Sequence, residues 1–370
     1  MSRARDLADL SSVSARLDTV GGSSGSFGVG RNVITNGAMQ VAQRGTSSTG
    51  LGTASGYYTV DRFKISMGAT TAGRFTMSQD SSAPSGFANS VKLECTTADT
   101  SIAAGEYLIL QQSLEGQDVQ RFAKGTSDAK EFTVSFYVKG NASATYVVAL
   151  YDNDNNRYVA KTFSVTTDWT RIEITYPADT TGAFDDDNAS SLELWIWLHA
   201  GSTFTSGTLS TTWASYSNAN TAVGAGSFFD STSRTFFMTG LQLEVGDTAT
   251  PFESRSYGDE LARCQRYFQV ISGGSDAYVV SAKGQSSSSV DATIPLTVSL
   301  RASPTMNSIN SRSFSDGGFS SSSSTTPTAL QYSDDNILLA VNCAGFSGLT
   351  NNEIQNWGPV SNALEIDAEL

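Results

Sequence analysis

The 370-residue sequence has very little histidine, and this limits the chemistry that it can perform. Its one histidine is His199, so a Ser–His–Asp triad or a histidine-rich metal centre would depend on that residue alone. The sequence also lacks a nucleophile-elbow motif and a phosphate-binding glycine pattern. We therefore predict a protein that is not an enzyme, with no catalytic residues and no cofactor. We expect His199 to be a hydrogen-bonding residue at the end of a strand.

Cysteine is equally scarce. Cys95, Cys264 and Cys343 are far apart and odd in number, which argues against a disulfide framework and against a clustered metal site. We expect three buried, reduced thiols in a protein made in a reducing cytosol. The oxygen-rich runs at 152–156 and 185–187 could offer calcium ligands, but they lack the EF-hand spacing. We interpret them as ordinary turns and predict no metal.

Long apolar runs and basic residues are also in short supply. No run approaches the roughly 20 apolar residues that span a bilayer, and the start lacks the apolar core of a signal peptide. We therefore predict no membrane insertion, and a protein that stays in the cytosol or leaves it by a route other than secretion. Acidic residues outnumber basic ones by 36 to 23, a net charge of −13. Such a surface repels phosphate backbones, so nucleic acid is not expected as a partner.

What the sequence does contain is strand patterns. Residues 32–254 alternate apolar and polar side chains again and again, as in 131–140 (EFTVSFYVKG), between polar turns. Short strands at regular spacing are typical of a β-sandwich or jelly roll. Similar patterns return in 269–370 and predict a smaller C-terminal β-sandwich. The predicted fold class is therefore all-β.

Two stretches have helical spacing instead. The first, in an N-terminal unit at 1–31 that ends in a Gly/Ser linker, places four apolar residues on one helical face: Leu7, Leu10, Val13 and Leu17. No neighbouring domain would cover that face, so it should dock on a partner protein or on copies of itself; a frayed tail is the alternative. The second, at 255–268, predicts a short helix that connects the two β domains.

The strand predicted at 191–199 has leucines on one face and aromatic and charged residues on the other. With outward residues of other strands, these define a candidate glycan or interface face: Trp195, Trp197, Glu193, Tyr137 and Arg171. Flat aromatic rings stack on sugar rings while acids, amides and guanidinium groups bind hydroxyls. Alternatively, the tryptophans pack under a loop, under the N-terminal helix or against a neighbouring subunit. We favour packing or a protein interface over sugar.

Two motifs resemble a family of bacteriophage virion proteins, described as tail fibre, head fibre or structural proteins. The first is 36–45 (NGAMQVAQRG); the second lies in 237–268 and contains TGLQLEVG, ATPFESRSY and CQRYF. In that family the first motif opens a jelly roll similar to carbohydrate-binding modules, and the second leads through a strand into a helix. The resemblance covers residues 32–268. The residue types of the second motif themselves indicate a structural joint rather than a chemical site.

The resemblance implies a virion appendage, assembled in the host cytoplasm. We expect a homotrimeric tail fibre, anchored by its N-terminal helix to virion proteins of the tail or portal-adaptor region, that attaches to a host surface glycan. One alternative is a head fibre or capsid decoration protein. Another is a depolymerase of surface polysaccharide, because glycoside cleavage needs two carboxylates and no histidine.

Overall fold

The computed structural model describes residues 30–68, 72–272, 280–308, 312–315, 320–323, 328–332, 338–344, 354–359 and 363–370. The helix predicted around Leu7, Leu10, Val13 and Leu17 lies outside these residues. The chain divides into two compact units, one made of residues 1–40 and 46–255, the other of 41–45 and 256–370. Residues 41–45, within the stretch predicted as the larger β domain, therefore belong to the second unit. None of the described helices is long and apolar enough to cross a membrane.

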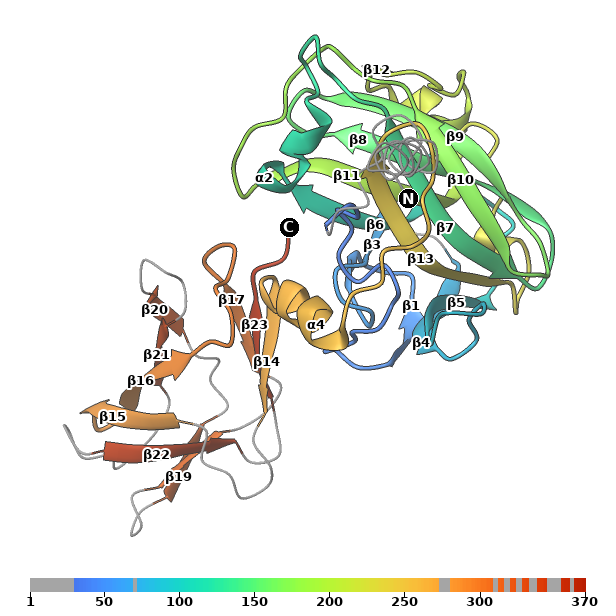
Figure 1. Ribbon diagram of the computed structural model, residues 1–370. Coiled ribbons are helices and arrows are strands. Elements are labelled where there is room, and N and C mark those ends of the chain that lie inside the picture. The colour runs from blue at the N-terminus through green and yellow to red at the C-terminus, as the bar shows by residue number, and fades with distance from the viewer. Residues whose placement is uncertain are drawn as a thin grey trace, which may run out of the picture. The chain divides into compact units, whose positions relative to one another are not determined.

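The first unit is a sandwich of two antiparallel sheets, which confirms the predicted all-β class (Figure 1). One sheet has six strands, in the order β1 (Ser47–Leu51), β4 (Arg74–Asp80), β5 (Ser90–Thr97), β13 (Thr235–Val245), β7 (Phe132–Gly140) and β10 (Thr170–Tyr176). The other has seven, in the order β12 (Ala214–Ser215), β9 (Arg157–Val165), β8 (Ala144–Asp152), β11 (Ser190–Ala200), β6 (Tyr107–Glu115), β3 (Lys64–Gly68) and β2 (Gly56–Tyr57).

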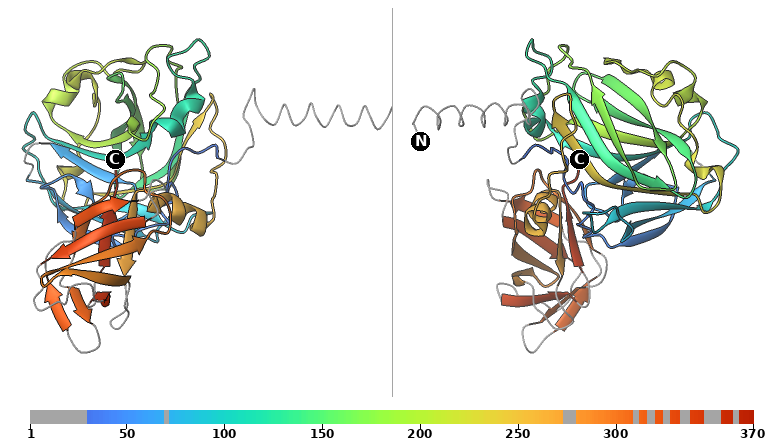
Figure 2. Two further views of the ribbon diagram at one scale, coloured as in Figure 1. Left: turned by 90° about the vertical axis from the view of Figure 1, so that its left-hand side faces the viewer. Right: turned by 45° about the vertical axis from the view of Figure 1, so that its right-hand side comes forward.

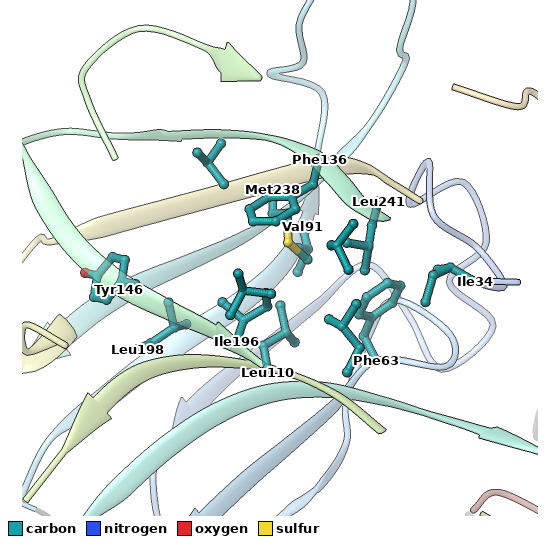
Figure 3. Close-up of a cluster of buried hydrophobic side chains, with 14 of the residues drawn as sticks. Ile34, Phe63, Val91, Leu110, Phe136, Tyr146, Ile196, Leu198, Met238 and Leu241 are labelled. Carbon is teal, nitrogen blue, oxygen red and sulfur yellow. The ribbon is translucent and has the colours of Figure 1, made fainter. Parts of the chain in front are cut away.

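The core of the first unit lies between the two sheets, as strand alternation predicts. Phe136 and Met238 come from the six-stranded sheet, Ile196 and Leu198 from the seven-stranded one, and all are fully buried in one cluster (Figure 3). Burying each such side chain contributes about 1.5–3 kcal/mol. Because the long strands use one face in this way, their alternate residues point outward on both sheets.

In the second unit, residues 41–45 are followed by helix α4 (Tyr257–Gln265). Ser256 forms the N-cap of this helix by accepting a hydrogen bond from the Asp259 amide. A three-stranded sheet follows the order β14 (Phe268–Ser272), β23 (Ala363–Asp367) and β17 (Thr305–Ser308). A seven-stranded sheet, orange to red in Figure 2, follows the order β19 (Ser320–Ser323), β18 (Arg312–Ser315), β22 (Ile354–Pro359), β15 (Val280–Ser286), β16 (Ser289–Pro295), β21 (Leu338–Ala344) and β20 (Thr328–Tyr332).

In the first unit, the segment after β13 is held by polar side chains of the second sequence motif. The Glu244 carboxylate accepts hydrogen bonds from the Thr250 amide (2.9 Å) and the Thr250 hydroxyl (2.6 Å). Gln242 accepts from the Glu253 amide (2.8 Å), and Glu253 in turn accepts from the Asn32 amide (2.7 Å). These groups satisfy one another, so this part of the motif has a structural role.

In the second unit, Arg44 of the first motif has a comparable role. Its guanidinium lies 3.1 Å from Asp367 Oδ2 and 3.3 Å from Glu369 Oε1, and its Cζ is 3.5 Å from the centre of the Phe268 ring. The neighbouring Gln43 donates to the Phe268 carbonyl at 2.8 Å. The pentapeptide 41–45 thus supplies a charged clamp for strands β14 and β23.

Candidate functional site

The five residues predicted to share one outward face lie on two different sheets. Trp195, Trp197 and Glu193 are on β11 of the seven-stranded sheet, whereas Tyr137 and Arg171 are on β7 and β10 of the six-stranded sheet. The outward sides of two stacked sheets face opposite directions. The prediction of one combined face is therefore corrected, because alternation along a strand does not reveal to which sheet the strand belongs.

Trp197 is packed rather than accessible, with only 1% of its surface exposed. Residues 201–226 contribute side chains such as Phe204, whose ring centroid is 5.4 Å from that of Trp197, to a second apolar cluster on the outward side of the sheet. The Trp197 indole donates to the Tyr158 hydroxyl at 2.9 Å, and Tyr158 donates to the Thr221 carbonyl at 2.8 Å. For Trp197, packing under a loop is therefore confirmed.

Trp195, two residues earlier, is only partly buried. Its ring stacks on Tyr151 with a centroid separation of 4.8 Å and an interplanar angle of 26°. Tyr216 meets both rings edge-on, at 5.3 Å from Tyr151 and 6.2 Å from Trp195. Trp195 is also in edge contact with Trp197 at 5.9 Å. The buried tryptophan thus supports an aromatic platform whose members retain accessible surface.

Polar residues continue from this platform across the sheet. The strand register aligns Trp195 with Gln111 on β6, Gln111 with Lys64 on β3, and Lys64 with Tyr57 on β2. Neighbouring strands are about 4.8 Å apart, so three steps separate the ends of this cross-strand row by about 14 Å. The Gln111 side-chain amide makes no hydrogen bond to the residues that the structure describes, although the residue is 7% exposed. The donor and acceptor of this amide are therefore available to a bound ligand or to water.

Glu193 adds a carboxylate beside the platform. Its Oε2 accepts a hydrogen bond from the Trp195 indole at 2.7 Å, and its Oε1 accepts from the Ser190 hydroxyl at 3.3 Å. Burial raises the pKa of Glu193, while the indole and the charge of Lys64 act in the opposite direction. The carboxylate is thus fixed in orientation, in line with Tyr151 on the next strand.

The platform and the cross-strand row contain residues that the sequence interpretation missed, namely Tyr57, Lys64, Gln111, Tyr151 and Tyr216. Tyr151 carried a usable signal, since it ends a continuous apolar run, 146–151, that is typical of a strand. The others depend on which strands become neighbours, and no local pattern contains that information.

His199 is a buried hydrogen-bonding residue at a strand end, as predicted. Its Nδ1 is 2.8 Å from the Ser227 hydroxyl and its Nε2 is 3.5 Å from Glu106 Oε2. This resembles a triad only in residue type. The Ser227 oxygen caps the short helix η3 (Phe228–Asp230) by accepting from the Phe229 amide, and the imidazole is fully buried against the Phe229 ring. Burial lowers the pKa of His199, while Glu106 opposes this shift.

At the turn 152–156, a lysine ammonium pairs with the carboxylate of Asp152. The Lys124 ammonium, fully buried, lies 2.5 Å from Asp152 Oδ2 and 3.1 Å from Asp179 Oδ2. It also donates to the carbonyls of Thr181 (2.8 Å) and Gly182 (2.7 Å). In the described part of the chain, no group of three or more histidine, cysteine, aspartate or glutamate residues is arranged to hold a metal ion.

Residues 87–219 match the family model of a carbohydrate binding domain. The match includes strands β6, β8, β9 and β11, and with them Gln111, Tyr151, Glu193 and Trp195. It covers 133 of the 370 residues. No curated protein matches the chain.

Three solved structures illustrate what the chain is similar to. A family 11 carbohydrate-binding module from Clostridium thermocellum is 13% identical over 56% of this chain and 98% of its own, with a TM-score of 0.27. TmCBM61, solved in complex with β-1,4-galactotriose, is 10% identical over 58% of this chain and 99% of its own, with a TM-score of 0.30. The enzymatically active domain of tailspike protein 4 from bacteriophage CBA120 is 11% identical over 58% of this chain, which spans 21% of that one, with a TM-score of 0.30.

Proposed function

We propose that the first unit binds glycans, without cleaving them, on the outward face of its seven-stranded sheet. The observation that carries this proposal is the Trp195–Tyr151 stack beside the amide of Gln111, which has no partner among the described residues. Aromatic rings beside a small number of placed polar groups are the combination by which binding sites orient a small ligand. These residues fall inside the segment that matches a carbohydrate binding domain.

The chemistry assigns a role to each group. The C–H face of a sugar ring packs on Trp195, while the Gln111 amide and the Lys64 ammonium donate hydrogen bonds to hydroxyls. Glu193 accepts hydrogen bonds, and its orientation is fixed in advance by the Trp195 indole. Tyr57 at the end of the cross-strand row offers a second ring, which favours a chain of several sugars over a single one.

The test uses a panel of soluble neutral polysaccharides in affinity electrophoresis. Trp195→Ala should weaken retardation by at least about tenfold, because it removes the platform. Trp169→Ala, directly before β10 of the other sheet, is the matched control and should leave binding of neutral glycans unchanged. Binding by the wild type to none of the panel, or unaltered binding by Trp195→Ala, would contradict the proposal.

We further infer that the chain belongs to a bacteriophage particle, as a homotrimeric tail fibre attached through its N-terminal helix to tail or portal-adaptor proteins and assembled in the host cytoplasm. Support comes from the motifs at 36–45 and 237–268, which resemble the virion family. The glycan site would then attach the particle to the host surface. A head fibre or capsid decoration protein is the alternative that the same motifs allow.

Three measurements test this role. Immunogold labelling of virions should place the protein on the tail; labelling of the head would favour the alternative. Deletion of residues 1–20 should prevent incorporation, and a solution mass measurement should give three copies. Release of reducing ends from host envelope would instead favour a depolymerase.

A further inference from the structure

The outward face of the six-stranded sheet carries a second aromatic and charged group. The register places Phe237 on β13 between Lys92 on β5 and Lys139 on β7. Its chain neighbours Phe236 and Met238 are fully buried in the core, so Phe237 points outward, where it remains partly exposed. The three side chains therefore form a short row across the middle of the sheet.

A tryptophan completes the apolar part of this row. Trp169 directly precedes β10, and its ring meets that of Phe237 at 6.2 Å with an interplanar angle of 69°. Both rings are partly buried, and neither belongs to the apolar core between the sheets. Two adjacent rings on an outward sheet face offer a surface on which another ring can pack.

The charges beside these rings are not balanced. Lys92 and Lys139 place their ammonium groups 5.6 and 5.8 Å from the centre of the Phe237 ring. Lys92 is neutralised by Glu94 at 2.5 Å, and Arg171 further along the sheet by Glu173 at 2.6 Å. Among the residues that the structure describes, Lys139 has no carboxylate within ion-pair distance. In a chain of net charge −13, this is a local excess of positive charge.

We propose that Trp169, Phe237 and Lys139 form a second glycan site, specific for sugars that carry a carboxylate, such as uronic acids. The sugar ring packs on the aromatic pair, and its carboxylate pairs with the Lys139 ammonium. Charge complementarity selects this ligand, because a neutral sugar would leave Lys139 without a partner. Nucleic acid would bring many phosphates toward an acidic chain and is disfavoured.

This site lies on the sheet opposite to the Trp195 platform, with the whole core between them. The two sites share no residue, so each can be removed alone. The inference stands even if the Trp195 platform binds no glycan.

The experiment compares two forms of one polymer, polygalacturonate and its fully methyl-esterified form, in affinity electrophoresis with the full chain. The wild type should be retarded more strongly by the acidic form than by the methyl ester, and the difference should shrink as salt is raised. Lys139→Gln and Trp169→Ala should each weaken this binding about tenfold. Lys130→Gln, which removes one exposed lysine charge elsewhere on the same unit, and Trp195→Ala should not.

Several results would overturn the proposal. These are no binding of the acidic polymer by the wild type, equal binding of the methyl ester, or equal behaviour of Lys139→Gln and Lys130→Gln. If Trp195→Ala lost binding of the acidic polymer, the acidic sugar would bind on the seven-stranded sheet, and this result would also refute the second site. Circular dichroism melts of each variant show whether the fold is retained.

Discussion

The ammonium of Lys124 lies 2.5 Å from Asp152 Oδ2, and both side chains are fully removed from solvent. Asp179, which also pairs with Arg157 at 2.7 Å, completes the charged group. An ion pair of this kind contributes little when compared with apolar residues of the same size, but breaking it leaves a buried charge without compensation.

We therefore predict that Lys124→Met lowers the free energy of unfolding by about 3–5 kcal/mol. Lys130→Met, at a nearby exposed lysine, should change it by no more than about 0.5 kcal/mol. Urea denaturation followed by tryptophan fluorescence measures both. Equal midpoints for the two variants would show that the buried pair does not stabilise the fold.

Substitution of the two tryptophans of β11 should affect different properties: Trp197→Ala mainly the stability of the fold, and Trp195→Ala mainly glycan binding. Trp197→Ala would open a cavity beneath residues 201–226 and cost about 3–5 kcal/mol. Trp195→Ala should cost less, because Trp195 is partly exposed already, while its effect on glycan binding is the larger one. Thermal melts paired with affinity electrophoresis give the comparison. The opposite order of stabilities would place Trp195 in the core.

The stability of the first unit should depend on pH through His199. Burial lowers the pKa of His199 in the folded state below its ordinary value of 6.5, so the unfolded chain binds the proton more tightly. The stability that neutral His199 contributes is fully present above the pKa that His199 has in the unfolded chain. It is lost as the pH falls through the lower pKa of the folded state. The charged groups that face the ring are Glu106 and Asp99.

Urea midpoints at about pH 7.5 and about pH 5.5 test this dependence. The wild type should lose more stability between them than His199→Gln, which cannot be protonated. Identical losses in both proteins would assign the pH dependence to carboxylates elsewhere.

Arg44 should be necessary for the stability of the second unit. Arg44→Ala would leave Asp367 and Glu369 close together without their shared cation and remove the contact on Phe268, at a cost of about 2–4 kcal/mol. Arg263→Ala, at an exposed position of helix α4, is the control. Hydrogen exchange at the amides of β14 and β23 reports on this unit; unchanged protection in Arg44→Ala would contradict the prediction.

How much of the fold and of the candidate site can be predicted from the sequence depends on how far apart along the chain the interacting residues lie. The alternation in Phe132–Gly140 is local, and it correctly predicts the fully buried face that includes Phe132 and Phe136. The same alternation cannot tell that Tyr137 and Trp195 point to opposite sides of the sandwich, since outward residues look alike on both sheets. Pairings across the chain, such as Lys124 with Asp152, depend on the fold as a whole.

The clamp formed by residues 41–45 limits how the two units can be exchanged between proteins. A recombination event with a single crossover before helix α4 would deliver a C-terminal unit without the pentapeptide with which it packs. Successful chimaeras, natural or engineered, should therefore join parents that share the Gln43–Arg44 pair or transfer this short upstream segment as well.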